Sequence, residues 1–290
     1  MKQIHGKPAA GRTVLVTGAS SGIGAATALG LAKMGAHLAI TGRNPERLET
    51  TARELRAAGA KQVNAFVADL SSEAQVRHLA DEVLQVLPHL DVLVNNAGGY
   101  WNTRHITADG LEHTVAVNHL APFLLTNLLL DRLKQSPQGR VVTVSSNAHA
   151  MGRIDFADLQ GERSYSGARA YNQSKLANVL FTYELARRIR GTSVTANALH
   201  PGVVRTSFGA EDPAGTQRLL LPFMRPFMKT PAAGAATSIH VASATDLEQT
   251  SGRYFANRKP TRSVRRSYDE ADAARLWHLS ADLVGLRESR

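Results

Sequence analysis

The sequence predicts a doubly wound α/β fold, in which helices cover both faces of one parallel sheet within a single domain. Two observations carry this prediction. Short apolar runs rich in β-branched residues alternate along the chain with stretches of helical length and spacing. In addition, the glycine-rich and polar motifs come directly after the apolar runs, at the strand ends where such sheets bind ligands. Crossovers between parallel strands are right-handed, so few other arrangements remain.

The elements follow in alternation. The run 13–17 is typical of a buried parallel strand, and a glycine-rich turn and an apolar-spaced helix through Met34 come after it. Pro45 suits the first turn of a helix and Gly59 suits its end. The remaining elements expected in order are strand 37–41, helix 45–58, strand 63–68, helix 72–86, strand 91–95, helix 111–134, strand 140–145, helix 171–190, strand 194–199 and a short strand near 253–255.

Length and composition fit one domain spanning residues 1–290. Of the 290 residues, 43% are hydrophobic, which is ample for a buried core, and no linker or internal repeat divides the chain. The absence of cysteine excludes disulfides and thiolate metal sites, and no other metal site is expected. The polar start of the chain and the lack of any span-length apolar segment lead us to expect a cytoplasmic protein.

The chain is strongly basic, with a formal net charge of +10 and a pI of about 10.2. Nucleic-acid binding is one explanation for such a charge. No nucleic-acid motif accompanies the basic residues, so a solvated surface is favoured and no nucleic-acid partner is expected. Many of these residues gather near the carboxyl end, at Arg253, Arg258, Lys259, Arg262, Arg265 and Arg266.

Three glycines follow the first strand and open the first helix in a G-x-x-x-G-x-G pattern, at Gly18, Gly22 and Gly24. Glycines permit a tight turn and let the backbone approach a pyrophosphate at a helix N-terminus. Because the turn stands between a strand and a helix, it predicts a dinucleotide site.

The end of the second strand discriminates between dinucleotides. An Asp or Glu there would bind the ribose 2′-hydroxyl of NAD, but the sequence is Thr41-Gly42-Arg43-Asn44. Arg43 can form a charge-assisted fork with a 2′-phosphate, which favours NADP(H) over NAD(H). The alternative is a surface arginine at a strand end.

Tyr171 and Lys175 stand four residues apart, on one face of the expected helix. The ammonium would favour the phenolate and lower a phenol pKa that is about 10 when unperturbed. Such a phenol can give or take a proton at a carbonyl or alcohol oxygen. Alone, this spacing is weak evidence, because a solvated helix face can carry it by chance.

Together with Asn95-Asn96-Ala97-Gly98, Asn118 and Ser145-Ser146, these motifs resemble the short-chain dehydrogenase/reductase family, which has a Rossmann-type fold. The resemblance covers roughly residues 11–255, with the motifs in the family's order. An apparent insertion at 151–169 and the stretches 117–119 and 171–178 are similar to its retinol-dehydrogenase-like branch. The resemblance implies a cofactor half at about 11–145 and a catalytic and substrate half at about 146–290.

The resemblance assigns four catalytic residues. It implies Tyr171 as the acid/base, Lys175 on the nicotinamide ribose, Ser146 on the substrate oxygen, and Asn118 holding a water in a proton relay. Ser146 is preferred to Ser145, because the family's catalytic serine is usually the second of such a pair. Strand alternation lets only one of the two face the site.

The resemblance also implies a set of cofactor contacts. Asp69 is among them, but it could equally cap the helix that begins near Ser72, a role that Ser71 or Ser72 suits better. Asn95, Ala97 and Gly98 could instead simply hold the central edge of the sheet together. Pro201 and Gly202 also fit a plain turn after a strand. The contacts implied are Gly18, Ser20, Ser21, Gly22, Ile23 and Gly24 at the pyrophosphate; Arg43 and Asn44 at the ribose; Asp69, Leu70, Asn95, Ala97 and Gly98 at the adenosine; and Tyr171, Lys175, Pro201, Gly202, Val204 and Thr206 at the nicotinamide side.

The strongly apolar segment 207–229 occupies the family's variable substrate loop. As a lid it would favour a lipophilic carbonyl or alcohol as the small-molecule substrate. The alternatives are core or dimer packing, and peripheral membrane contact. Tyr100, Trp101 and His149 are candidate pocket walls. The sequence thus predicts an NADP(H)-dependent carbonyl/alcohol oxidoreductase, expected as a homo-oligomer. The competing hypothesis is a non-catalytic nucleotide-binding regulator or scaffold of the same fold.

Overall fold

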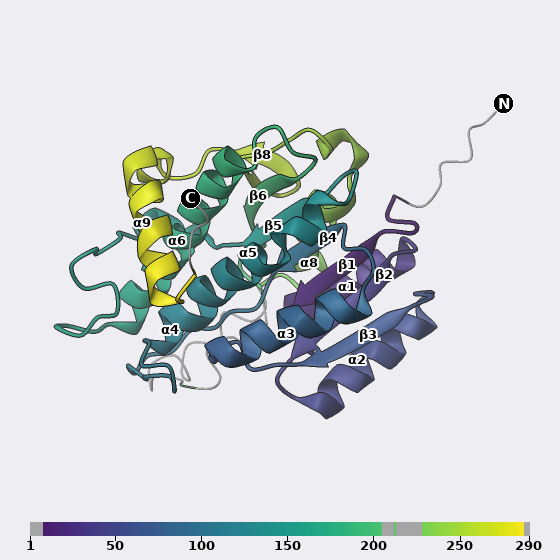
Figure 1. Ribbon diagram of the computed structural model, residues 1–290, viewed down its shortest axis with the longest axis horizontal. Coiled ribbons are helices and arrows are strands. Elements are labelled where there is room, and N and C mark those ends of the chain that lie inside the picture. Colours follow the sequence, from purple (N-terminus) through teal and green to yellow (C-terminus); the bar gives the residue numbers. More distant parts are fainter. Residues whose placement is uncertain (1–7, 205–211, 213–227, 287–290) are drawn as a thin grey trace.

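The computed structural model describes residues 8–204, 212 and 228–286. Its strands form one eight-stranded sheet in the order β3-β2-β1-β4-β5-β6-β7-β8 (Figure 1). All neighbouring strands pair in parallel except β7 and β8, which are antiparallel. The predicted doubly wound fold is confirmed. The strands are β1 Thr13–Thr17, β2 His37–Gly42, β3 Val63–Val67, β4 Val92–Asn95, β5 Arg140–Val144, β6 Thr195–His200, β7 Arg253–Ala256 and β8 Lys259–Thr261.

Helices cover both faces of this sheet. The main described helices are α1 Gly22–Lys33, α2 Pro45–Ala57, α3 Glu73–Val86, α5 Ala121–Lys134, α6 Gly167–Arg188, α8 Pro231–Ser243 and α9 Glu270–Leu283. Side chains alternate between the faces along each strand. Leu15 of β1 therefore joins the core beneath α3, α5 and α6, whereas Val14 and Val16 join the core beneath α1, α2 and α8.

Among the described residues, the α-helices α8 and α9 and the strand β8 were not predicted. Helix α8 is built largely from Ala, Gly and Ser, so the sequence gives little amphipathic signal. It packs closely on α1, where a Cβ on Gly30 would lie 2.3 Å from Cδ1 of Ile239. Helix α9 begins after Asp269, whose side chain accepts a hydrogen bond from the amide of Asp272. Strand β8 is a three-residue edge strand, too short to show a period.

The predicted helix 111–134 is interrupted. A short helix α4, His113–Val115, runs into a single π-helical segment η1, Ala116–Leu120, before α5 begins. Such π-segments are frequent at functional sites, and Asn118 lies within this one. None of the helices among the described residues combines the length and the apolar character needed to cross a membrane.

Candidate active site

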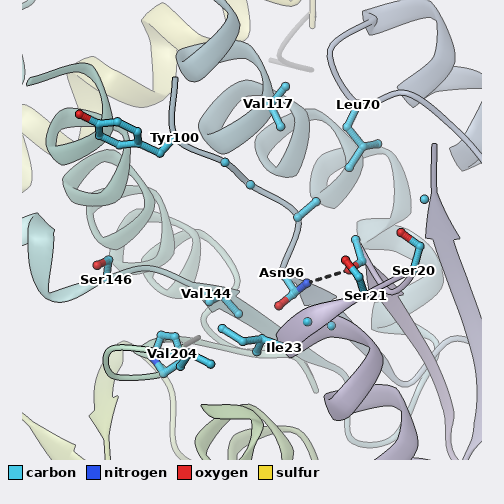
Figure 2. Close-up of a pocket in the computed structure, with 18 of the residues that line it drawn as sticks. Ser20, Ser21, Ile23, Leu70, Asn96, Tyr100, Val117, Val144, Ser146 and Val204 are labelled. Atoms are coloured by element: carbon cyan, nitrogen blue, oxygen red, sulfur yellow. Dashed lines mark hydrogen bonds between the residues drawn. The ribbon is translucent and has the colours of Figure 1, made fainter. Parts of the chain in front are cut away.

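A cavity of about 500 Å³ lies at the carboxyl ends of the parallel strands, where the fold predicts a ligand site. Figure 2 shows Ser20 and Leu70 on one side of it and Ser146 and Tyr100 on the other. Most of the predicted site residues line this cavity. They are Gly18, Ser20, Ser21, Gly22, Ile23, Gly24, Arg43, Asp69, Leu70, Ala97, Gly98, Ser146, Tyr171, Lys175, Pro201, Gly202 and Val204. Thr206 lies outside the described residues.

The glycine-rich turn is shaped by backbone conformation and by close packing. Gly18 and Gly22 have φ of +64° and +58°, in the left-handed region that favours glycine. A Cβ on Gly24 would lie 2.3 Å from the carbonyl oxygen of Gly18. The side-chain amide of Asn96 holds the turn by donating to the carbonyl oxygen of Thr17 at 2.8 Å. The result is a bare backbone cradle at the N-terminus of α1, which fits a pyrophosphate.

Gly24→Ala should weaken NADPH binding by at least about tenfold, because the added methyl must displace the Gly18 carbonyl from the cradle. Titration of NADPH against wild type and variant measures this. Gly59→Ala is the control: its φ is +105° but a Cβ there meets no heavy atom within 4 Å. It should lower stability and leave the Kd unchanged. Unaltered NADPH binding by Gly24→Ala would show that the turn is not the pyrophosphate site.

The end of the cavity near β2 and β3 carries Arg43 and Asp69. Arg43 is exposed and follows β2 directly. Asp69 is the only carboxylate among the described lining residues, and it follows β3 instead. Its Oδ1 accepts a hydrogen bond from the Ser71 amide at 2.9 Å. Ser72, not Asp69, caps α3 by accepting from the amide of Gln75. The end of β2 thus presents a guanidinium to the cavity and no acid.

Two predicted cofactor contacts, Asn44 and Asn95, lie outside the cavity lining, and their contact with a cofactor stays a prediction. Asn44 caps α2, since its Oδ1 accepts from the Arg47 amide at 2.8 Å. Asn95 is the last residue of β4 and points into the core, where its Nδ2 donates to Oγ1 of Thr126 at 2.8 Å. Asn96, one residue on, faces the other way and lines the cavity. Strand alternation separates the two asparagines, and identical side chains gave no sign of which faces the site.

Tyr171 and Lys175 lie one turn apart on α6, as predicted. The Nζ of Lys175 is 5.5 Å from the Tyr171 ring centroid and donates to the Val144 carbonyl oxygen at 3.4 Å. Burial raises the pKa of Tyr171, and a hydrogen bond with Ser146 offsets part of this rise. Burial also lowers the pKa of Lys175 to about 8. The net shift of the Tyr171 pKa is therefore upward, opposite to the expected lowering, and burial is its largest cause.

The two serines after β5 point in different directions. The hydroxyl of Ser145 donates to the Lys175 carbonyl oxygen at 2.7 Å, so it faces α6. The Oγ of Ser146 accepts from the Ala148 amide at 3.2 Å and is hydrogen-bonded to the phenol of Tyr171. Ser146 is thus the serine whose hydroxyl meets the candidate acid/base, and its catalytic role stays a prediction.

Asn118 is fully buried beside this centre and does not line the cavity. Its Oδ1 accepts from the amide of Gly99 at 2.8 Å, and its Nδ2 donates to the Gly99 carbonyl oxygen at 2.9 Å. Nδ2 also donates to Oγ of Ser174 at 3.1 Å. The side chain therefore ties the cavity wall to α6. Its role in holding a relay water stays a prediction.

Aromatic and apolar side chains form the open end of the cavity beside Tyr171. Tyr100 and Trp101 line it, and the Tyr100 ring meets the Tyr171 ring edge-on with centroids 5.6 Å apart. Met228, from the predicted substrate loop, also lines it. The rest of the segment 207–229, apart from residues 212 and 229, lies outside the described residues. His149, a predicted wall, is instead buried behind Ser146, which corrects that prediction.

The insertion at 151–169 packs against the same end of the site. The side-chain amide of Gln173 on α6 donates to the Leu159 carbonyl oxygen at 2.8 Å. The Tyr165 hydroxyl donates to Oε1 of Glu112, the buried cap of α4, at 3.2 Å. The insertion therefore braces α6, which carries Tyr171, and the start of α4, which leads into the π-helical segment.

Comparison with known proteins agrees with this architecture. The family model for short chain dehydrogenase matches residues 12–216. Human retinol dehydrogenase 12 is 46% identical over 278 residues, which cover 96% of this chain and 87% of that protein. A crystal structure of an uncharacterised protein from Mycobacterium paratuberculosis superposes with a TM-score of 0.79 at 37% identity, covering 97% of this chain and 96% of that one.

A Pseudomonas aeruginosa structure described as an RhlG/NADP active-site complex has a TM-score of 0.69 at 30% identity. The match covers 87% of this chain and 97% of that one. The residues 12–216 that the family model matches include the glycine-rich turn, the serine pair and the Tyr171–Lys175 helix. The chain therefore belongs to the short chain dehydrogenase family and is an NAD(P)-dependent oxidoreductase that interconverts alcohols and carbonyl compounds.

Proposed function

We propose that this protein is an NADP(H)-dependent oxidoreductase acting on a lipophilic carbonyl or alcohol, with Tyr171 as the acid/base. One observation carries the proposal. A single cavity connects Arg43, through the glycine-rich turn, to the hydrogen-bonded Tyr171 and Ser146 hydroxyls. The cavity thus has a guanidinium at one end and a pair of hydrogen-bonded hydroxyls at the other.

The cavity residues fit a dinucleotide. The turn around Gly18 and Gly24 would hold the pyrophosphate, Asp69 and Leu70 would hold the adenosine, and Pro201 and Gly202 would flank the nicotinamide. When bound, the nicotinamide supplies or accepts the hydride, which no amino-acid side chain can do. The protein's part is to orient the reactants and to manage the proton.

The proton is managed by the hydroxyls at the open end. Because burial raises its pKa, Tyr171 holds its proton at neutral pH and is ready to donate it to a carbonyl oxygen. The Ser146 hydroxyl, already bonded to the phenol, is placed to donate a second hydrogen bond to the same oxygen. In the opposite direction Tyr171 must become a phenolate. The Lys175 ammonium, one helical turn away, favours that charge.

Arg43 supports the preference for NADP(H). It is the guanidinium at the end of β2, and the acid that would bind a ribose 2′-hydroxyl is not among the described residues there. The RhlG complex, which contains NADP, shares the same fold. A 2′-phosphate would form a charge-assisted hydrogen bond with the exposed Arg43 guanidinium.

Arg43→Ala should raise the Kd for NADPH by about one to two orders of magnitude, since a charge-assisted hydrogen bond contributes roughly 1.5–3 kcal/mol. NADH, which lacks the phosphate, should bind as before. Titration of both cofactors against both proteins measures this. Arg53→Ala, which removes an exposed charge from α2 away from the cavity, is the matched control.

The preference for NADP(H) fails if wild type already prefers NADH, or if Arg43→Ala weakens both cofactors equally. A double variant that adds Gly42→Asp to Arg43→Ala should move the preference toward NADH, because the new carboxylate supplies an acceptor for the ribose hydroxyl. A Cβ on Gly42 lies 3.0 Å from Oγ of Ser20, so that hydroxyl must turn aside in the double variant.

The lipophilic substrate is supported by the open end of the cavity and by the relatives. Tyr100, Trp101 and Met228 present rings and a thioether around Tyr171. The relatives named retinol dehydrogenases act, as their name states, on retinol, which is a long apolar alcohol. NADPH oxidation with retinal, a steroid ketone and short water-soluble aldehydes tests the substrate class. Preference for the short aldehydes would overturn the lipophilic assignment, and no turnover with any carbonyl would favour a binding-only protein.

Three further expectations stay predictions: a cytoplasmic location, a homo-oligomeric state, and peripheral membrane contact as an alternative role for the 207–229 segment. Sedimentation of the protein with and without vesicles addresses the oligomer and the membrane contact together.

A further inference from the structure

His149 is a buried side chain that has no part in the scheme above. It lies in the short helix η2, Asn147–Met151, three residues after Ser146, and it is 4% exposed. Its Nδ1 is 2.7 Å from the carbonyl oxygen of Ser146, and its Nε2 is 3.1 Å from the amide nitrogen of Val264. The imidazole therefore bridges the backbone of the catalytic loop and a segment more than a hundred residues later.

The hydrogen-bond partners fix which ring nitrogen carries the proton. The Val264 amide is a backbone donor, so Nε2 of His149 must accept and must be without a proton. The carbonyl oxygen of Ser146 can only accept, so Nδ1 must donate. His149 is thus a neutral imidazole with its proton on Nδ1. Burial, which lowers its pKa, keeps it neutral at pH 7.

The Ser146 carbonyl oxygen is held from a second direction. The hydroxyl of Tyr254, on β7, donates to it at 3.4 Å and lies 3.3 Å from Nδ1 of His149. The two rings pack with centroids 4.7 Å apart. The main chain of Ser146 is therefore clamped by side chains from η2 and β7, while its hydroxyl faces Tyr171 on the other side.

We propose that His149 is a positioning residue, which holds the main chain of Ser146 so that the Ser146 hydroxyl meets the Tyr171 phenol and the substrate oxygen. This inference rests on the proposed function, in which Ser146 hydrogen-bonds the substrate. Its physical basis is that small displacements of an oriented donor have large kinetic effects. The Nδ1–H bond is the part of the bridge that acts on Ser146; the Nε2 bond orients the ring.

The two halves of the bridge are separated by two conservative variants. In His149→Asn the side-chain NH₂ can take the place of Nδ1 and still donate to the Ser146 carbonyl oxygen, but Val264 loses its acceptor. In His149→Gln the side-chain oxygen can take the place of Nε2 and accept from Val264, but the donor to Ser146 is lost. His149→Ala removes both. Thermal unfolding and NADPH titration identify the variants that are folded.

The steady-state kcat with a saturating carbonyl and NADPH is measured for each variant. His149→Ala and His149→Gln should lower kcat about 10- to 100-fold with the NADPH Kd unchanged, since a misplaced catalytic group costs about this factor. His149→Asn should keep kcat within about threefold of wild type because the donor to Ser146 remains. The reverse order, with Gln active and Asn impaired, would assign His149 to anchoring the Val264 segment and overturn the proposal.

A double-mutant cycle then tests whether His149 acts through the Ser146 hydroxyl. In a Ser146→Ala background there is no hydroxyl to position, so His149→Gln should change kcat by less than about twofold. If His149→Gln lowers kcat by the same factor in both backgrounds, the proposal is overturned. Comparing the kcat of wild type with that of Ser146→Ala tests the proposed function by itself. Failure of the proposed function can therefore be told apart from failure of the inference about His149.

The tautomer is tested without any turnover. Side-chain ¹⁵N chemical shifts of His149 in wild type should show a proton on Nδ1 and a bare Nε2 at neutral pH. A proton on Nε2, or a charged ring, would remove the hydrogen bond to Ser146 on which the inference depends.

Discussion

Tyr171→Phe should abolish turnover and leave NADPH binding intact. The substitution removes only the oxygen that carries the proton, and the ring remains to pack edge-on against Tyr100. General acid/base groups contribute about 10²–10⁴ in rate. The loss should fall at the upper end, because the Tyr171 phenol is hydrogen-bonded to the Ser146 hydroxyl in the cavity wall. The measurement is kcat on a carbonyl whose chemical step is rate-limiting, with NADPH affinity from a separate titration.

The matched control for this prediction is Tyr183→Phe. Tyr183 lies on the same helix and also carries a buried hydroxyl, which is 2.7 Å from Oγ of Ser263. It does not line the cavity, so its loss should lower stability and leave kcat nearly unchanged. The assignment of Tyr171 is abandoned if Tyr171→Phe keeps more than about a few per cent of wild-type kcat, given the size of acid/base contributions.

Ser146→Ala should cost far more activity than Ser145→Ala. Loss of one donor to a developing oxyanion typically costs about 10²–10³ in rate. Ser145 instead donates to the Lys175 carbonyl oxygen, so Ser145→Ala should cost about 0.5–1.5 kcal/mol of stability and less than about tenfold in kcat. Comparison of the two variants by kcat and by thermal unfolding separates catalysis from packing. Equal or reversed kcat losses would show that the wrong serine is assigned.

Both predictions depend on features that short stretches of sequence could indicate. The spacing of Tyr171 and Lys175 follows from the pitch of a helix, and Gly18, Gly22 and Gly24 are needed wherever a strand turns sharply into a helix around a phosphate. Because apolar strands alternate with helices of matching length, the doubly wound parallel sheet is the expected fold. The motifs then lie together at the carboxyl ends of its strands.

Alternation implies only that one of Ser145 and Ser146 faces the site, and the resemblance to the short-chain dehydrogenase/reductase family selected Ser146. The same rule did not help with Asn95 and Asn96. Two adjacent asparagines are chemically identical, and the sequence does not show which of them faces the core. Only the packing of β4 against α5, where Asn95 bonds to Thr126, decides it.

The sequence by itself determined the doubly wound fold, the dinucleotide site and the pair of residues on α6, because each depends on local backbone geometry and residue spacing. The tertiary structure alone decided the direction of the Tyr171 pKa shift, the burial of Asn118, and the position of His149 between Ser146 and Val264. The physical reason is that burial and long-range hydrogen bonds are properties of the packed chain. Desolvation acts on a side chain through every element that covers it, and those elements come from distant parts of the sequence.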